Sequence, residues 1–302
     1  MKPLWVSSLK CVVRDVSPKP PYAITPHLRR FSLPNHPTPA IVEGSTYRRL
    51  VNLGKGLVAV KAVVVREGWK PLIRFRVCSP KSLVEEGLRV AVSMFRTGFS
   101  YLEFLKAASK SPAIYGLALK YLGLRPIRTP SLYESLIESV VEQRVALKAA
   151  LRTISSLVKD FSACLRVGGE PYYSEPLPVR VAGASEDFIR GHGLTRVKAR
   201  ALREVALAEV EGRLPGVNEV TESPNAAVNE LVKLYGVGRW TAEIAVAKVL
   251  PGFRVGPVSD LAVRRGLSAI YGRELGEGEV REIASAYGEF TGLVMYLGSL
   301  ER

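Results

Sequence analysis

The spacing of apolar residues changes once along the chain, near residue 80, and this change constrains the fold more than any other feature. Before it, two β-branched segments, 56–65 and 71–79, alternate in character and are separated by the turn-like sequence REGWK. After Ser82, apolar residues recur at three- and four-residue spacing, which indicates about ten helices. The sequence therefore predicts an α+β protein: a small N-terminal antiparallel β domain, residues 1–84, and then a mostly helical domain, residues 85–302.

The chain is strongly basic, and its charge is unevenly distributed. The formal net charge is +15, and residues 1–100 carry 17 Lys and Arg against 5 Asp and Glu. Such a charge favours a polyanionic partner, most often nucleic acid, although a merely soluble basic protein is the alternative. Residues 101–302 are nearly neutral, with 26 basic against 23 acidic residues. Any phosphate contacts in the helical part therefore depend on where single residues lie.

Other features of the composition exclude whole classes of protein. No apolar run approaches the ~18 residues of a membrane span, and Lys10 and Arg14 interrupt the apolar N-terminus. Cys11, Cys78 and Cys164 lie far apart, so they predict neither a metal site nor an even set of disulfides. We expect a reducing cytosolic compartment, no bound metal and no cofactor.

A glycine turn separates two helical patterns at about residues 224–250. Gly236 should end the first helix in a left-handed conformation, and Gly238 should begin a second, almost wholly apolar helix. The free N–H groups at that helix start suit a DNA phosphate, and two residues without side chains let it approach. The alternative is a tight turn without a ligand. A nucleotide-binding glycine loop is the weaker alternative, because the segment lacks the Lys and Ser/Thr of a P-loop and no strand precedes it.

An aspartate follows this turn at a short distance. Asp260 comes after the sequence GPVS and directly before another helical pattern, which begins at Leu261. A carboxylate in this position is a good N-cap, because it accepts hydrogen bonds from the first N–H groups of the helix. Capping does not prevent the same carboxylate from acting in chemistry.

The motifs around these residues resemble those of the helix-hairpin-helix DNA glycosylases, in particular the inducible 3-methyladenine DNA glycosylase (type II) group. The similar stretches cover about residues 85–298 and follow the family order: GLRPIRTPSLYESLIESVVEQRVALKAA (123–150), GLTRVKARALREVA (193–206), GVGRWTA (236–242) and SDLAVRRGL (259–267). The resemblance implies a helical core of two subdomains with the active site in the cleft between them.

The resemblance also implies an activity, that of a base-excision repair enzyme. Such an enzyme flips a damaged, here alkylated, base out of double-stranded DNA and hydrolyses its N-glycosidic bond, with Asp260 as the catalytic residue. In relatives that also cut the strand, a Schiff-base lysine occupies the position of Trp240, so we expect a monofunctional enzyme. The expected protein is a monomer that acts with the chromosome, in the cytoplasm or in a nucleus, and not at a membrane.

The remaining site residues follow from the same alignment of motifs. The base pocket should contain Trp240, Ile244 and Phe290. The expected DNA-binding residues are Gln143, Arg144, Gly236, Gly238, Arg239 and Thr241. Arg144 occupies the place of the leucine that fills the gap left by the flipped base in the alkyl-base enzymes, and the alternative is that it lies on a helix surface and pairs with Glu142 or faces solvent.

Two other functions stay open at this point. Ile244 replaces an aromatic residue of the alkyl-base enzymes, and the C-terminal segment is more similar to 8-oxoguanine glycosylases, with Phe290 and Tyr296 as its aromatic rings. An oxidised-base glycosylase, with or without lyase activity, is therefore the first alternative. A non-enzymatic helix-hairpin-helix DNA-binding protein is the second, but such a protein has no need of Asp260.

Overall fold

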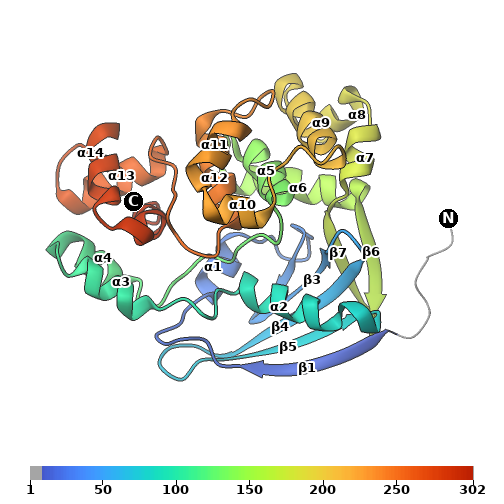
Figure 1. Cartoon of the computed structure of the whole chain (residues 1–302), viewed down its shortest axis with the longest axis horizontal. Coiled ribbons are helices and arrows are strands. Elements are labelled where there is room, and N and C mark those ends of the chain that lie inside the picture. Colours follow the sequence, from blue (N-terminus) through green and yellow to red (C-terminus); the bar gives the residue numbers. More distant parts are fainter. Residues whose placement is uncertain (1–8, 302) are drawn as a thin grey trace.

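A five-stranded antiparallel sheet forms one side of the molecule in the computed structural model, which describes residues 9–301 (Figure 1). The strand order is β1-β5-β4-β3-β2, with β1 Lys10–Val16, β2 Ile41–Glu43, β3 Thr46–Asn52, β4 Leu57–Arg66 and β5 Leu72–Ser79. In β5, Ile73, Phe75 and Val77 are buried whereas Arg74 and Arg76 are exposed, as a strand with one covered face requires. The predicted antiparallel β region is therefore confirmed.

Helix α2 (Val84–Met94) covers the apolar face of this sheet (Figure 1). The two elements approach closely at Gly87, where a Cβ atom would lie 2.5 Å from Cγ1 of Val58 in β4. Leu88 and Met94 are buried in the same cluster as the strands. The sheet core thus continues through the helix that begins at the predicted domain boundary, and the boundary at residue 84 stays a prediction.

A second β-structure lies within the helical part, where the sequence was expected to contain no strands. Strands β6 (Ser162–Val167) and β7 (Glu170–Pro176) form an antiparallel hairpin. It packs on the outer face of the sheet, where Val167 and Tyr172 share a cluster with Leu50. The expectation was wrong because Gly168–Gly169, both with positive φ, are a hairpin-turn signal between short alternating segments.

The cysteines also differ from the expectation. Cys11 of β1 and Cys78 of β5 are opposite each other in the sheet and form a disulfide, and Cys164 is free. The number and spacing of the cysteines did not indicate this disulfide, because sheet pairing brings together residues that are 67 apart in the sequence. The argument for a reducing compartment loses its basis with it.

The helices outnumber the expected ten because short helices break the longer patterns. After residue 84, three helices last only five or six residues, α7 (Pro178–Gly183), α8 (Glu186–Arg190) and α10 (Val217–Glu222). The others are α1 Thr25–Arg30, α3 Tyr101–Ala108, α4 Pro112–Lys120, α5 Leu132–Glu142, α6 Leu147–Phe161, α9 Arg196–Val210, α11 Pro224–Leu231, α12 Arg239–Val249, α13 Leu261–Tyr271, α14 Glu277–Ser285 and α15 Thr291–Gly298. Within residues 9–301, no helix is long and apolar enough to traverse a lipid bilayer.

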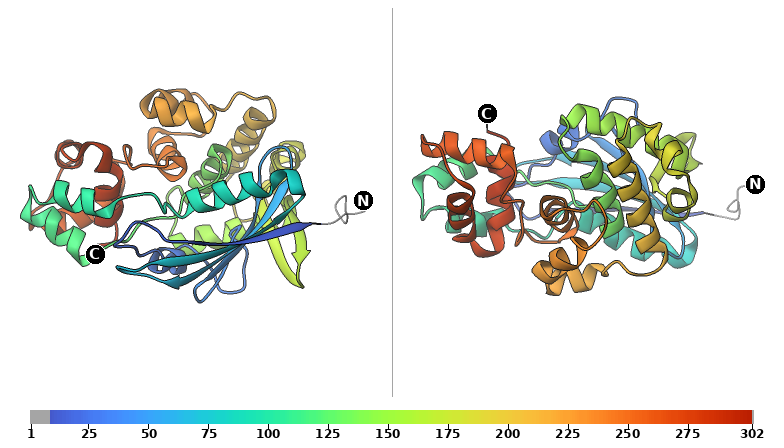
Figure 2. Two further views of the ribbon diagram at one scale, coloured as in Figure 1. Left: turned by 60° about the horizontal axis from the view of Figure 1, so that its bottom comes forward. Right: turned by 90° about the horizontal axis from the view of Figure 1, so that it is seen from above.

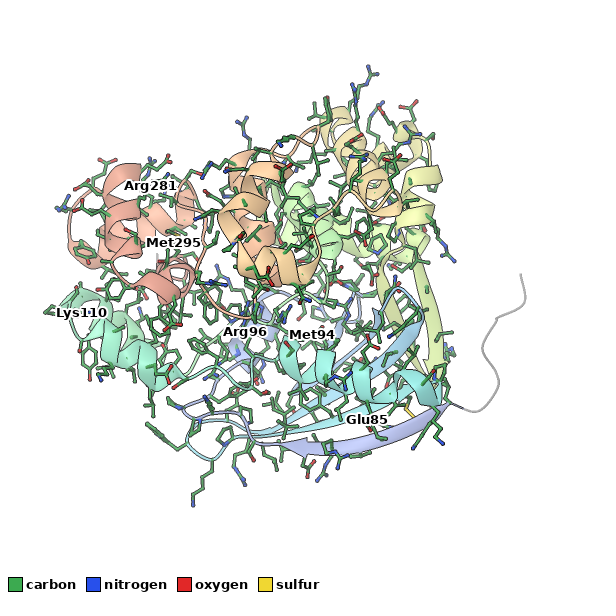
Figure 3. All side chains as sticks on the ribbon, viewed as in Figure 1. Glu85, Met94, Arg96, Lys110, Arg281 and Met295 are labelled. Atoms are coloured by element: carbon green, nitrogen blue, oxygen red, sulfur yellow. A yellow bond between two sulfur atoms is a disulfide. The ribbon has the colours of Figure 1, made fainter. Side chains whose placement is uncertain are left out.

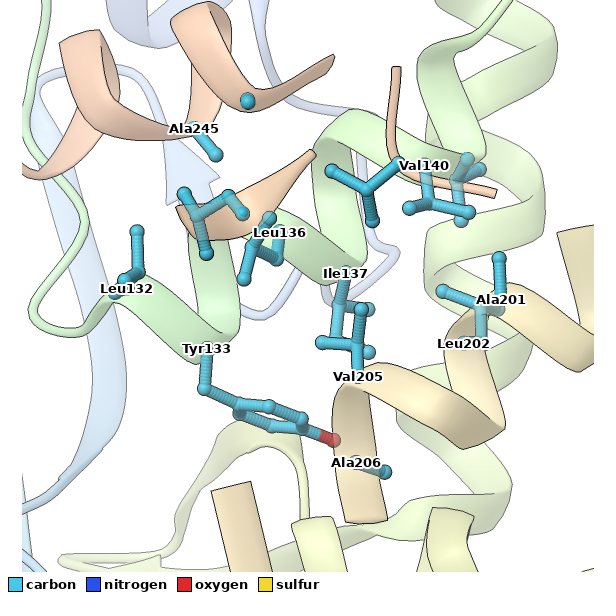
Figure 4. Close-up of a cluster of buried hydrophobic side chains, with 14 of the residues drawn as sticks. Leu132, Tyr133, Leu136, Ile137, Val140, Ala201, Leu202, Val205, Ala206 and Ala245 are labelled. Atoms are coloured by element: carbon cyan, nitrogen blue, oxygen red, sulfur yellow. The ribbon is translucent and has the colours of Figure 1, made fainter. Parts of the chain in front are cut away.

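Two separate apolar clusters organise the helical part. The first joins α5, α6, α9, α11 and α12, and Figure 4 shows its centre, where Ile137 of α5 lies near Val205 of α9. The second joins α3 and α4 to α13, α14 and α15 at the other end of the molecule (Figure 2). Helices far apart in sequence thus share the second cluster, which includes both Phe104 and Phe290.

Two buried arginines fasten the junction between the sheet and the helices. Arg96, just after α2, lies between the helical groups (Figure 3) and donates to five carbonyls, those of Pro126, Ala247, Leu250, Pro251 and Gly252. Arg125 is fully buried and donates to four carbonyls, those of Pro21, Arg96, Phe99 and Gly123. The backbone around the C-terminal end of α12 is therefore held in place by side chains from the N-terminal half of the chain.

Candidate active site

The turn between α11 and α12 has the predicted left-handed glycine and helix start, but α11 ends at Leu231 and not, as expected, at Gly236. Gly236 has a φ of +74°, so the predicted left-handed conformation is confirmed. A Cβ atom on Gly236 would lie 2.5 Å from Cβ of Ala201 in α9, whereas nothing lies within 4 Å of the corresponding point at Gly238, the N-cap of α12. The room expected for a phosphate therefore exists beside Gly238, and the missing side chain of Gly236 serves packing against α9.

Asp260 is held by three hydrogen bonds at the start of α13. Its Oδ1 accepts from the backbone N–H groups of Ala262 and Val263, at 2.8 and 3.1 Å. Its Oδ2 accepts from Nε1 of Trp240 at 2.9 Å. The predicted N-cap role is therefore confirmed, and the indole adds an orientation that the sequence did not reveal. Both oxygens point to fixed partners, so the carboxylate is preorganised.

A cavity of about 410 Å³ lies beside this carboxylate. One face of α12 forms part of its wall, because residues at three- and four-residue spacing lie on the same side of a helix. The wall contains residues from the N-terminal segment, the linker after α4, α5, α12 and the C-terminal helices, among them His27, Arg49, Arg128, Glu138, Glu142, Trp240, Ile244, Lys248, Asp260 and Tyr296. Three of the predicted site residues, Asp260, Trp240 and Ile244, are thus brought together at one cavity.

Helix α5 presents a row of carboxylates to this cavity. Glu134, Glu138 and Glu142 are four residues apart, so they lie along one face of the helix. Lys248 of α12 donates to Glu138 at 3.0 Å and to Glu142 at 2.8 Å. Burial alone would lower the pKa of the Lys248 ammonium, but the two carboxylates raise this pKa well above its ordinary value. Lys248 is therefore held as a cation and is a poor nucleophile.

The third carboxylate of this row belongs to a buried ion pair. Glu134 accepts two hydrogen bonds from Arg49 of β3, at 2.6 and 2.7 Å, and the two side chains are 2% and 3% exposed. Glu175 of β7 lies 3.6 Å from the same guanidinium. Burial, together with the charge of Glu134, raises the pKa of Glu175 to about 7. This cluster ties the sheet to α5 directly behind the cavity.

The loop after α5 is tied to the glycine turn. Nε2 of Gln143 donates to the Gly236 carbonyl and to Oγ1 of Thr241, both at 2.9 Å. The ammonium of Lys198 donates to the carbonyls of Val141 and Gln143, at 2.8 and 2.7 Å. Lys198 is thus buried and holds the loop after α5 to α9.

Arg144 follows in this loop with an exposed side chain and a φ of +53°. A non-glycine residue in the left-handed region is uncommon and marks a locally constrained backbone. Within residues 9–301, Arg144 makes no ion pair or side-chain hydrogen bond, and Glu142 is engaged by Lys248. The alternative in which Arg144 pairs with Glu142 is therefore not what the structure shows. Arg239, at the start of α12, is half exposed and pairs with Glu243 at 3.0 Å.

One predicted pocket residue lies elsewhere. Phe290 is 7% exposed and does not line the cavity; it packs against Phe99 and Phe104 in the second helical cluster. Its expected place in the base pocket is corrected, because the 3-10 turn before α15 directs the ring into the core. Tyr296, one of the two rings considered for this region, does line the cavity.

The sequence did not indicate the part of the cavity wall on which His27 and Tyr296 lie. His27 is buried there, stacked on Phe31, and its Nδ1 lies 2.9 Å from the Tyr296 hydroxyl. Burial lowers the pKa of His27 to about 3, so its imidazole is neutral at ordinary pH. These two residues are 269 positions apart, and no local pattern joins them. The i, i+4 spacing of the α5 carboxylates was a sequence signal for a different part of the cavity wall, the part that α5 forms.

Comparisons with known proteins agree with this geometry. No known protein-family profile matches the chain. The DNA-3-methyladenine glycosylase of Bacillus subtilis (strain 168) is 24% identical over 189 residues, which are 62% of each protein. The chain therefore spans less than two thirds of that relative's length.

Solved structures match over nearly the whole chain. A 3-methyladenine DNA glycosylase from Archaeoglobus fulgidus superposes with a TM-score of 0.81 at 24% identity, over 94% of this chain and 97% of that one. MBOgg1 in complex with a low-affinity DNA ligand superposes with a TM-score of 0.75 at 17% identity, over 97% of this chain and 98% of that one. The chain therefore has the fold of the helix-hairpin-helix DNA glycosylases, and DNA-3-methyladenine glycosylases are among its relatives in sequence.

Proposed function

We propose that the protein is a monofunctional DNA glycosylase that flips a damaged base out of duplex DNA and hydrolyses its N-glycosidic bond. The observation that carries this proposal is the Asp260 carboxylate, oriented by Trp240 and by the start of α13 at the edge of a cavity. In this proposal the protein acts as a monomer on chromosomal DNA. Its two helical clusters are the two subdomains, and the active site lies in the cleft between them.

Asp260 would act on the sugar side of the bond. As the bond between C1′ and the base nitrogen breaks, the base leaves with the bonding electrons and positive charge develops on the deoxyribose. The fixed carboxylate stabilises this charge, and it accepts a proton from the water that adds to C1′. The products are the free base and an abasic site.

An alkylated purine is the base that we favour. The Bacillus subtilis and Archaeoglobus fulgidus relatives are named for 3-methyladenine. A cationic methylated purine is attracted to an aromatic face, which Trp240 and Tyr296 supply in the cavity wall. Such a base leaves without first being protonated, so the reaction needs no second acidic group to protonate it, and Asp260 alone suffices.

The most direct experiment is incubation of the protein with duplexes that carry single alkylated, deaminated or oxidised bases, followed by alkali to cleave abasic sites. Release of an alkylated base supports the proposal. Release of 8-oxoguanine alone would favour the oxidised-base alternative. Tight DNA binding with no release of any base would favour a non-enzymatic DNA-binding protein, for which a carboxylate fixed beside a cavity has no use.

Borohydride is expected not to trap the protein on lesion-containing or abasic DNA. Trp240 occupies the place of the Schiff-base lysine, and Lys248, which lines the cavity, is held protonated by Glu138 and Glu142. A protonated amine cannot attack C1′. Gel electrophoresis of the borohydride reaction gives the result, with a known glycosylase/lyase as the positive control, and efficient formation of an adduct would contradict the monofunctional assignment.

The DNA-binding surface that we propose surrounds Arg144. The turn at Gly236 and Gly238, together with Arg239, would contact the phosphates, and the buried Gln143 and Thr241 would position this turn. Arg144, held in its loop by the bonds of Gln143 and Lys198, would enter the gap that the flipped base leaves. A guanidinium can stack between bases and also donate to the orphaned partner base.

Arg144→Ala is accordingly expected to slow base release from well-paired duplexes much more than from mismatched ones. Opening a paired base costs a few kcal/mol, and a mismatched base costs less. Single-turnover rates on the same lesion opposite a matched and a mismatched base test this. Arg152→Ala, an exposed arginine in the following helix, is the charge-matched control. Equal losses on both duplexes, or no loss on either, would rule out the wedge.

A further inference from the structure

Four buried or partly buried basic side chains on the cavity wall differ in how many of their donors have partners. Arg49 is bound to Glu134, Lys248 is bound to two glutamates, and Arg96 donates to five carbonyls. Each of these three therefore has a structural task. Arg128 differs from them, because no carboxylate lies within ion-pair distance of it in the described part of the chain, residues 9–301.

Arg128 lies in the linker between α4 and α5, where the backbone fixes its position. Its own N–H donates to the Met94 carbonyl at 2.9 Å, and the N–H of Thr129 donates to the Lys248 carbonyl at 3.0 Å. The side chain is thus placed beside the face of α12 that lines the cavity. Nη1 donates to Oγ of Ser93 at 2.6 Å, which holds the guanidinium plane.

The remaining donors of this guanidinium have no partner among residues 9–301. Nε is buried without a hydrogen bond, as is the neighbouring Oγ1 of Thr129, and Nη2 donates to no protein atom. A buried donor without an acceptor costs free energy in the empty protein. Nη2 is not among the buried atoms, so it is the donor that a ligand in the cavity can reach, and an acceptor placed there would give the guanidinium a second partner.

We infer that Arg128 is a specificity-determining residue that selects purines with a carbonyl oxygen at position 6 over purines with an amino group at position 6. The inference rests on the proposed glycosylase function and names its substrate class: oxopurines such as 7-methylguanine and hypoxanthine, in preference to 3-methyladenine. A guanidinium has only donors, so it bonds to a carbonyl oxygen. An amino group in the same place would put its N–H groups against those of the guanidinium, and neither group would find an acceptor.

The size of the preference follows from the strength of one hydrogen bond to a charged group. Loss of such a bond changes a rate by about ten- to a hundredfold. DNA treated with a methylating agent contains 7-methylguanine and 3-methyladenine in one substrate. Both lesions are cationic, so a comparison of their release cancels the general effect of lesion charge.

The experiment compares the release of both bases from this DNA, quantified by chromatography, for the wild type and for Arg128→Met. We expect Arg128→Met to slow release of 7-methylguanine by about ten- to a hundredfold while release of 3-methyladenine is unchanged or faster. Arg89→Met, an exposed arginine of α2 away from the cavity, is the charge-matched control. Arg128→Lys, which keeps the charge but loses the planar donor pair, should shift the ratio in the same direction and replaces Arg128→Met if that variant unfolds.

The outcomes separate the two proposals. If the wild type releases neither base, nor hypoxanthine from a defined duplex, the proposed function fails and the inference falls with it. If the wild type releases bases and Arg128→Met reduces both in the same proportion, the proposed function stands and the role of Arg128 in specificity is overturned. A ratio of the two bases that changes only in the Arg128 variants supports the inference.

Discussion

Replacement of Asp260 by asparagine is expected to slow base release by about a hundred- to a thousandfold and to leave DNA affinity within a few-fold. Asparagine retains an oxygen that can accept from the N–H groups of Ala262 and Val263, so the start of α13 keeps its cap. The substitution removes the negative charge that stabilises the sugar cation. It also places an NH₂ group or an uncharged oxygen opposite Nε1 of Trp240, where a carboxylate oxygen now accepts.

Single-turnover rates on each lesion that the wild type releases measure this effect, and titration with the same duplex measures affinity. Asp187→Asn, which changes an exposed acid in α8, is the matched control and should behave as the wild type. Wild-type rates in Asp260→Asn on every substrate would remove Asp260 from the chemistry. A large loss of affinity with an unchanged rate would instead make it a DNA-binding residue.

The second large effect concerns stability. Arg49→Met is expected to lower the free energy of unfolding by about 3–5 kcal/mol, because it leaves the Glu134 carboxylate buried without its partner. Both side chains are almost fully buried, and Glu175 lies against the same guanidinium, so little water can replace the lost bonds. Denaturant unfolding at neutral pH gives the value.

A double variant shows whether the unpaired charge is the cause. Adding Glu134→Gln to Arg49→Met should recover part of the loss, since a neutral amide costs less to bury than a carboxylate. Arg74→Met, which breaks an exposed pair with Asp15 on the same sheet, should cost about 1 kcal/mol or less. Equal losses in the buried and the exposed variant would mean that the cluster behind the cavity contributes no more than a surface ion pair.

The sequence predicted those parts of the fold that depend on local patterns. The alternation in residues 71–79 predicted a half-buried strand, and Gly238 predicted the start of α12, although α11 ends at Leu231 and not at Gly236 as expected. Asp260 was recognised as a cap because capping depends on the next three residues. Each of these predictions rests on interactions between residues close in sequence.

The rest of the site depends on contacts between distant segments, which local patterns do not contain. The bond from Trp240 to Asp260 spans 20 residues, and the contact of His27 with Tyr296 spans 269. Phe290 was misplaced because an aromatic residue in a C-terminal helix can face either the cavity or the core, and only the packing of α3 and α15 decides. The disulfide between Cys11 and Cys78 likewise follows from strand pairing across the sheet.

The carbonyls gathered by Arg96 and Arg125 have a mechanical consequence. These carbonyls belong to the linker before α5, to the chain leaving α12 and to the segment between β1 and α1, so a rotation of one part against another would break many buried hydrogen bonds at once. We therefore expect the cavity to keep its shape when DNA binds, without closing around the base. The duplex must supply the deformation that brings a base into it, and lesions that weaken stacking or pairing enter at a lower cost than normal bases.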